Sequence, residues 1–115
     1  MIFQKDFFSQ LISELNKIDL SKIEKIVNIL VKLKRRKGKL YIIGIGGSAA
    51  NASHAVNDFR KLCGIDALSP VDNFSEFTAT TNDQGFENAF VESLKTSRIN
   101  KKDLLMVFSV GGGDE

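Results

Sequence analysis

The apolar residues at the start of the chain recur at helical spacing, every three or four positions. They predict an amphipathic helix over residues 3–18. A second helix is expected from Ser21, because Ser21-Lys22-Ile23-Glu24 has the form of a capping box. Its apolar stripe runs from Ile23 to Leu33. Two helices before any strand predict a helical hairpin over residues 1–37, with more apolar surface than a small sheet can cover. Such a surplus is typical of a subunit interface.

Beyond residue 38, short apolar runs alternate with helical periods. The runs at 40–43 and 104–108 have the composition of buried strands, and 66–71 indicates a weaker edge strand because Pro70 interrupts it. The intervening helices are expected to run from 48 to about 62, from 72–75 to 82–85, and across 86–94. This alternation predicts an α/β fold with an open parallel sheet.

The strand expected at 40–43 leads into the glycine-rich turn Gly44-Ile45-Gly46-Gly47. Ser48 follows as the expected N-cap of a helix. Free backbone N–H groups and the positive end of the helix dipole then meet at one place, which favours a phosphate. The spacing matches neither a P-loop nor a dinucleotide fingerprint. On this turn alone, phosphate binding and simple packing of strand against helix are about equally favoured.

The strand expected at 104–108 also ends in serine and glycine, at Ser109-Val110-Gly111. Because parallel strands end at the same edge of a sheet, Ser48 and Ser109 should share one crevice. Two converging loops favour the phosphate interpretation over packing alone.

Composition limits the remaining possibilities. The chain has 115 residues, enough for one domain, and its net charge of +2 gives no case for nucleic acid. The basic run 32–37 is interpreted as the charged last turn of a helix with Gly38 as its C′ residue. The single cysteine, Cys63, excludes a disulfide framework and is expected to be buried. No stretch has the length of a membrane span, and a cytoplasmic location is expected.

Three blocks of sequence together resemble the SIS (sugar isomerase) domain family. They are Gly44–Ala50 continuing to His54, Asn82–Phe86, and Asp103–Leu105 followed by Ser109. Within the family the likeness is greatest to phosphoheptose isomerases, which interconvert sedoheptulose 7-phosphate and glycero-manno-heptose 7-phosphate. It covers this whole chain but only the N-terminal part of the family's domain. Residues 1–115 are therefore expected to form a single partial SIS domain.

The resemblance implies a flavodoxin-like sheet preceded by the helical hairpin, with residues 38–115 forming its first strands and helices. It also implies a homotetramer with active sites between subunits, and a phosphorylated sugar as substrate. Asp58 lies where the family has a glutamate that acts as acid and base. His54 and Asp58 lie where some members bind zinc. Substrate contacts are implied for the following positions: Ile45, Gly46, Gly47, Ser48, Asn82, Asp83, Ser109, Val110 and Gly111. Asp114 lies on the same phosphate loop, where its negative charge is unfavourable beside a phosphate unless it points away.

Several positions depart from the family pattern. Ile45 replaces an asparagine, and Asp58 is one methylene shorter than glutamate. Residues 110–113 lack the usual hydroxyl groups of the phosphate loop. From the residues alone, the His54–Asp58 pair at i and i+4 is more often a simple helix-surface pair, by about three to one, because a closed zinc site needs more ligands.

The resemblance implies aldose–ketose isomerisation through an enediol. In the family a second catalytic group, a histidine, follows later in the domain, whereas the only histidine here is His54. The 115 residues alone are therefore expected to be inactive. Two alternatives remain open: a non-catalytic SIS module that binds a phosphosugar or a protein such as a replication initiator, or a truncated product without a function. A binding module should stay oligomeric through its helical hairpin, whereas a broken fragment should aggregate.

Overall fold

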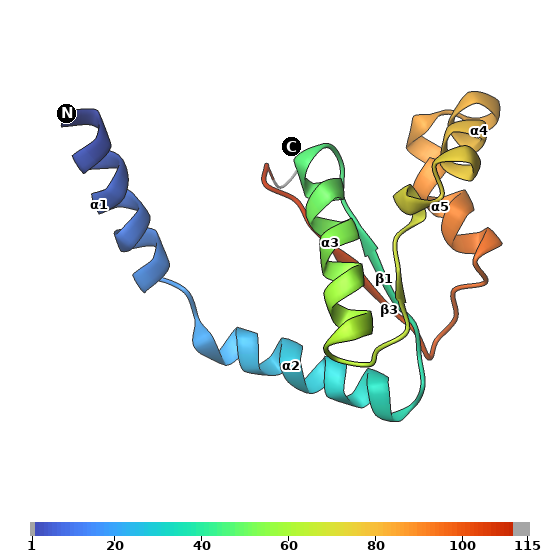
Figure 1. Ribbon diagram of the computed structural model, residues 1–115, viewed down its shortest axis with the longest axis horizontal. Helices are drawn as coiled ribbons and strands as arrows, with labels where there is room; N and C mark the ends of the chain where they lie inside the picture. The colour runs from blue at the N-terminus through green and yellow to red at the C-terminus, as the bar shows by residue number, and fades with distance from the viewer. Residues whose placement is uncertain (1, 112–115) are drawn as a thin grey trace. The chain divides into compact units, whose positions relative to one another are not determined.

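The computed structural model describes residues 2–111, and the chain divides into two units, Met1–Leu30 and Val31–Glu115. The first unit contains α1 (Ile2–Asn16) and the start of α2 (Leu20–Arg35), shown in Figure 1. The end of α2 belongs to the second unit. The boundary between the units therefore lies inside α2.

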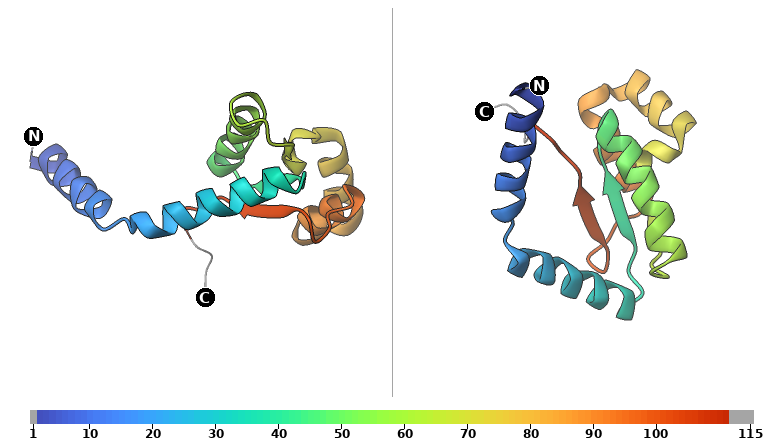
Figure 2. Two further views of the ribbon diagram at one scale, coloured as in Figure 1. Left: turned by 90° about the horizontal axis from the view of Figure 1, so that it is seen from below. Right: turned by 60° about the vertical axis from the view of Figure 1, so that its left-hand side comes forward.

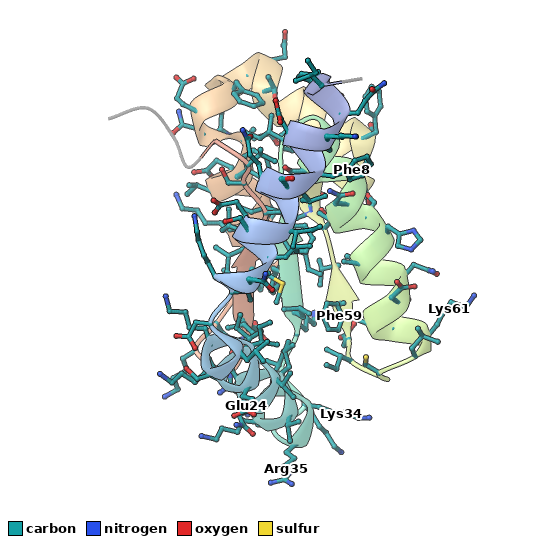
Figure 3. All side chains as sticks on the ribbon, turned by 90° about the vertical axis from the view of Figure 1, so that its left-hand side faces the viewer. Phe8, Glu24, Lys34, Arg35, Phe59 and Lys61 are labelled. Atoms are coloured by element: carbon teal, nitrogen blue, oxygen red, sulfur yellow. The ribbon has the colours of Figure 1, made fainter. Side chains whose placement is uncertain are left out.

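Both predicted leading helices are formed, and their apolar stripes are exposed. No residue of α1 is buried, and the only buried residue of α2 is Leu33, which lies in the second unit. Phe8, labelled in Figure 3, is 59% exposed. The other large apolar side chains that are exposed in the first unit include Phe3, Phe7, Leu11, Ile12, Leu15, Ile18, Ile23, Ile26 and Val27. The excess of apolar surface predicted for these helices is therefore present.

Asp19, and not Ser21, caps the N-terminus of α2. Its Oδ1 accepts a hydrogen bond of 2.9 Å from the backbone N–H of Ser21, and the helix begins at Leu20. The predicted capping box is therefore wrong by two residues. Aspartate is as good an N-cap as serine, and its carboxylate also interacts favourably with the helix dipole.

The C-terminus of α2 is closed by a Schellman motif. The N–H of Gly38 donates to the Leu33 carbonyl and the N–H of Lys37 donates to the Lys34 carbonyl, each over 3.1 Å. Lys37 has φ of +55° and is the C′ residue, so the prediction of Gly38 at C′ is wrong by one position. Position 38 still requires glycine, because a Cβ there would lie 2.0 Å from the carbonyl oxygen of Lys102.

One residue of the basic run has a clear structural role. The Arg36 side chain donates from Nε to the Lys102 carbonyl over 2.6 Å and from its terminal nitrogen to the Asp103 carbonyl over 3.3 Å. It thereby joins the end of α2 to the loop before the last strand. Lys34 and Arg35 carry their charges at the same end of α2 (Figure 3), which is where cations interact favourably with the helix dipole.

The sheet has three parallel strands in the order β2-β1-β3. They are β1 (Leu40–Ile43), β2 (Ala67–Leu68) and β3 (Leu104–Val107). Figure 2 shows β1 and β3 side by side, in a register that pairs Leu40 with Leu104. The central strand β1 carries the core, because Leu40, Tyr41 and Ile42 are fully buried. β2 is the predicted edge strand, and the short 3-10 helix η1 (Pro70–Asp72) follows it at the proline.

The strand predicted at 104–108 is formed, but none of the residues of β3 is buried, contrary to the prediction. β3 lies at the other edge of the sheet, and within the described residues no strand pairs with its outer side. Leu105 and Val107, which are in register with Tyr41 and Ile43, are 40% and 60% exposed. The alternation arises because successive side chains of a strand point to opposite faces.

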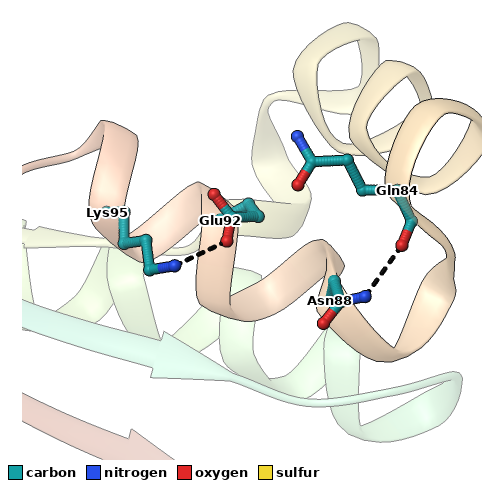
Figure 4. Close-up of polar contacts among 4 residues, drawn as sticks. All are labelled: Gln84, Asn88, Glu92 and Lys95. Atoms are coloured by element: carbon teal, nitrogen blue, oxygen red, sulfur yellow. Dashed lines mark hydrogen bonds and ion pairs between the residues drawn. The ribbon is translucent and has the colours of Figure 1, made fainter.

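Three helices complete the second unit: α3 (Gly47–Lys61), α4 (Phe74–Gln84) and α5 (Phe86–Thr96). Ala52 and Val56 form the buried face of α3. Gly85, with φ of +86°, joins α4 to α5, and Figure 4 shows Asn88 Nδ2 donating to the carbonyl of Gln84 over 2.8 Å. Cys63 lies in the turn after α3 and is exposed, so the expectation that it is buried is wrong. Within residues 2–111 no helix is long and apolar enough to cross a membrane.

The phenol of Tyr41 is held inside this unit, where its hydroxyl donates to the Ser97 carbonyl over 3.0 Å. Burial raises its pKa, and the negative charges of Asp103 and Asp66 raise it further. Tyr41 is the only tyrosine, and the chain has no tryptophan.

We therefore expect the phenolate absorbance of the chain to appear with a midpoint clearly above pH 10, the ordinary tyrosine pKa being about 10. Because the folded state holds this proton more tightly than the unfolded state, stability should fall as pH rises past about 10. Absorbance titration at 295 nm measures the midpoint of Tyr41 in the folded chain, and the same titration in urea measures it in the unfolded chain. Equal midpoints in the folded and unfolded chain would contradict the burial of Tyr41.

Candidate functional site

A cavity of about 700 Å³ lies at the carboxyl ends of β1 and β3, where the sequence predicted a crevice. This volume is in the range of small-molecule sites. The Gly44–Ser48 turn forms one side and the 107–111 segment the other. Its lining residues are Ile43, Gly44, Ile45, Gly47, Ser48, Asn51, Phe90, Val107, Phe108, Ser109, Val110 and Gly111.

Gly44 has a packing role at this site. A Cβ at this position would lie 2.4 Å from the carbonyl oxygen of Ser48 and 2.9 Å from the backbone nitrogen of Ala49. Since real Cβ atoms do not approach so closely, only glycine lets the end of β1 touch the first turn of α3. For Gly44, the simple packing interpretation of the turn is therefore sufficient.

Gly46 and Gly47 have a different environment, since a Cβ on either would meet nothing within 4 Å. Gly46 has φ of +59°, which favours glycine, and it is the N-cap of α3. The N–H groups of Ser48 and Ala49 donate to the carbonyls of Ile45 and Gly46 over 3.1 and 3.0 Å. Within the described residues, the N–H groups of Gly46 and Gly47 make no hydrogen bond. These two donors are therefore available to an anion.

Ser48 lies in the first turn of α3 and is not its N-cap, which corrects the prediction, and no side chain caps this helix. The residue is only 9% exposed and lines the cavity. Its hydroxyl has no hydrogen-bond partner among residues 2–111. The unpartnered hydroxyl of this buried residue, together with the free N–H groups of Gly46 and Gly47, can complete a small anion site.

The second loop reaches the same cavity because β3 pairs directly with β1. The N–H of Phe108 donates to the carbonyl of Ile43 over 2.8 Å, which joins the two strand ends. Ser109, Val110 and Gly111 line the cavity, as the two-loop prediction requires. Asp114, which the resemblance placed on the same loop, lies outside the described residues.

His54 and Asp58 lie farther along α3, outside the cavity lining. Nε2 of His54 is 3.3 Å from Oδ2 of Asp58, and the two side chains are 77% and 47% exposed. A closed zinc site needs three or four protein ligands. Within residues 2–111 no group of three histidine, cysteine or acidic residues converges, so the described residues do not form a complete metal site.

Asn82 and Asp83 are also outside the cavity lining. They are exposed on the last turn of α4, where Asn82 Nδ2 donates to Asp83 Oδ1 over 3.0 Å. Their proposed contact with substrate stays a prediction from the resemblance.

Besides Gly44 and the strand-end residues Ile43, Val107 and Phe108, two lining residues were not predicted as site residues. Asn51 follows Ser48 by three positions, which places both on one side of α3, so helical spacing could have indicated it. Phe90 comes from α5, where its ring packs edge-to-face with Phe77 at 5.0 Å between centroids. Its spacing with Phe86 predicted only a helix, and no local signal connects it to the cavity.

The comparisons with known proteins agree with this architecture. The profile of the SIS domain family matches residues 5–115, and the chain belongs to that family. The solved structure of phosphoheptose isomerase GmhA from Neisseria gonorrhoeae superimposes with a TM-score of 0.78 over 96% of this chain. At 23% sequence identity, that likeness establishes the fold alone.

Curated relatives share the name phosphoheptose isomerase. The protein from Helicobacter pylori (strain P12) is 30% identical over 125 aligned positions, covering 99% of this chain and 62% of the relative. The protein from Roseiflexus sp. (strain RS-1) is 36% identical over 75 positions, covering 61% of this chain and 38% of the relative. The chain therefore spans less than two thirds of the length of these relatives.

The two kinds of glycine in the turn should respond differently to alanine. Gly44→Ala forces a methyl group against backbone atoms and should lower the free energy of unfolding by about 1–3 kcal/mol, the usual cost of overpacking. Gly47→Ala adds its methyl group to open space at the cavity and should leave stability unchanged to within about 0.5 kcal/mol. Urea unfolding followed by circular dichroism measures both. Equal losses in the two variants would contradict this division of roles.

Proposed function

We propose that the chain is the phosphate-binding part of an SIS-type sugar-phosphate isomerase. One observation carries the proposal: Ser48 and Gly47 line a cavity between two strand ends, the Ser48 hydroxyl has no partner within residues 2–111, and the N–H groups of Gly46 and Gly47 in the same turn make no hydrogen bond there. These donors suit the oxygens of a phosphate monoester, and the positive end of the α3 dipole adds to the attraction. Ser109 supplies a hydroxyl from the opposite loop.

The relatives' names favour a phosphorylated heptose as the sugar. Asp58 is our candidate for the acid/base group that moves a proton between C1 and C2 in the intact enzyme. It follows Ser48 by ten residues along α3, a rise of about 15 Å. A ligand that reaches from Ser48 towards Asp58 must be long, which favours an open-chain heptose phosphate over a three-carbon sugar phosphate.

The 115 residues alone are expected to bind a phosphorylated sugar without isomerising it. Their only histidine, His54, is paired with Asp58 on the same helix, so they hold no histidine on the opposite side of the ligand. A phosphosugar-binding module without chemistry is the second candidate function. This second candidate is favoured because His54 and Asp58 both lie outside the cavity lining. The cytoplasmic location stays a prediction from the sequence.

Ser48→Ala should weaken phosphate binding by about tenfold or more, because a hydrogen bond to a charged group contributes about 1.5–3 kcal/mol. Backbone amide NMR shifts during titration with inorganic phosphate or sedoheptulose 7-phosphate measure the affinity and locate the site. Shifts should cluster at residues 46–50, with dissociation constants on the order of millimolar after the costs of binding.

Ser53→Ala is the matched control, since Ser53 lies on the same helix but donates its hydroxyl to Asp72. It should leave phosphate binding unchanged. Shifts confined to residues 107–111, or no shifts at all, would refute the assignment of phosphate to the Ser48 turn. In the same samples sedoheptulose 7-phosphate should remain unconverted. Turnover above that of Asp58→Ala would show that these residues suffice for catalysis.

We also propose that the chain forms a homo-oligomer through the Met1–Leu30 unit. Its apolar stripes are exposed along both helices, and Phe3 is 79% exposed. A surface of this kind is unusual for a monomer. A second copy presents the same stripe and can cover it in an isologous contact. The tetramer implied by the family resemblance is one assembly that such contacts could build.

Sedimentation velocity should therefore show a dimer or a larger species, and Leu11→Glu should shift it towards the monomer, because the new carboxylate would have to be buried in the contact. Gln10→Glu, which adds the same charge at a polar position of α1, is the control and should leave the assembly intact. A well-folded monomer at high concentration would contradict the proposal.

A further inference from the structure

We propose that Asn51 orients the carbon chain of the bound ligand by hydrogen bonding to an oxygen on the carbon atoms nearest the phosphate. This inference rests on the proposed function, because it takes the Ser48 turn as the phosphate site. It assigns Asn51 a role in positioning and specificity, separate from phosphate binding.

The polar groups of the cavity are few. Ser48, Asn51 and Ser109 are the lining residues with polar side chains, and the rest are glycines or carry hydrocarbon side chains. Asn51 is the only amide in this lining. An amide offers both a donor and an acceptor, so it can bind either a hydroxyl or a carbonyl oxygen.

The position of Asn51 on α3 suits a contact just beyond the phosphate. It follows Ser48 by three residues, so it lies on the same side of the helix and about 4.5 Å farther along the axis. A ligand whose phosphate contacts Ser48 and whose chain extends along α3 meets Asn51 next. His54 and Asp58 continue the same side of the helix by one and two further turns, and Asp58 is the candidate acid/base group.

The apolar part of the lining makes Asn51 the main polar contact on its side of the cavity. Ile45, which lies in the turn before α3, is 62% exposed, and Val110 in the opposite loop is 96% exposed. Neither side chain can hydrogen bond to a sugar hydroxyl. Among the described lining residues on this side of the cavity, Asn51 is therefore the one whose side chain can hydrogen bond to oxygens beyond the phosphate.

No structural role accounts for this asparagine. Its side chain is exposed and makes no hydrogen bond within residues 2–111. It is not a cap of α3, whose N-cap is Gly46. Ala49, Ala50 and Ala52 surround it in the sequence, and alanine is a stronger helix former than asparagine. Asn51→Ala should therefore fold at least as stably as the original chain.

The test compares two probes, inorganic phosphate and sedoheptulose 7-phosphate, by amide NMR titration of the full chain and of Asn51→Ala. Since one neutral hydrogen bond changes affinity by about three- to tenfold, Asn51→Ala should weaken sugar-phosphate binding by that factor. Binding of inorganic phosphate should change less than twofold. Asn28→Ala is the control, an exposed asparagine of α2 outside the cavity lining whose side chain makes no hydrogen bond within residues 2–111, and should change neither affinity.

The outcomes separate this inference from the proposed function. Unchanged sugar-phosphate affinity in Asn51→Ala, with phosphate still bound at Ser48, overturns the role of Asn51 and leaves the proposed function standing. Equal losses of affinity for both probes in Asn51→Ala, or an equal loss in Asn28→Ala, also overturn the role of Asn51. If neither probe binds the original chain, the proposed function fails and this inference fails with it.

Discussion

The candidate site depends on the close contact between the end of β1 and the first turn of α3. That contact exists because residue 44 has no side chain, and a Cβ there would lie 2.4 Å from the carbonyl oxygen of Ser48. With the strand and helix this close, the turn between them is short and the start of α3 opens directly onto the cavity. Ser48 is then buried at the cavity wall, beside the free N–H groups of Gly46 and Gly47.

A second constraint brings the other loop to the same place. β3 is joined to β1 at both ends, by the N–H of Leu104 donating to the Lys39 carbonyl and that of Phe108 donating to the Ile43 carbonyl. Parallel strands in register end together, so their loops diverge around one crevice. The proposed anion site uses backbone N–H groups and serine hydroxyls and needs no charged side chain. A cluster of basic residues in the sequence was therefore not required to predict it.

The face of α3 that is directed away from the core explains how phosphate binding and chemistry could be combined in this fold. Ala52 and Val56 are buried, and Ser53 donates its hydroxyl to Asp72 in η1. Ser48 is also buried, at the start of the helix, and the more exposed side carries Asn51 at the cavity and Asp58 farther along. One rigid helix thus presents, in order, the proposed phosphate contact, the proposed polar contact and a carboxylate, at separations set by the helix itself.

The sequence by itself determined the elements, because helical and strand periodicities are local properties of the chain. It placed β1 at residues 40–43, the edge position of the strand before Pro70, and the two serine loops at one edge of the sheet. Only the tertiary structure decided which side chains enter the cavity. Packing of Ala52 and Val56 fixes the rotation of α3 about its axis and brings Asn51 to the cavity, whereas His54, one turn farther along the helix, lies outside the lining. Phe90 reaches the cavity from α5, which lies far away in the sequence, so no local pattern could have revealed it.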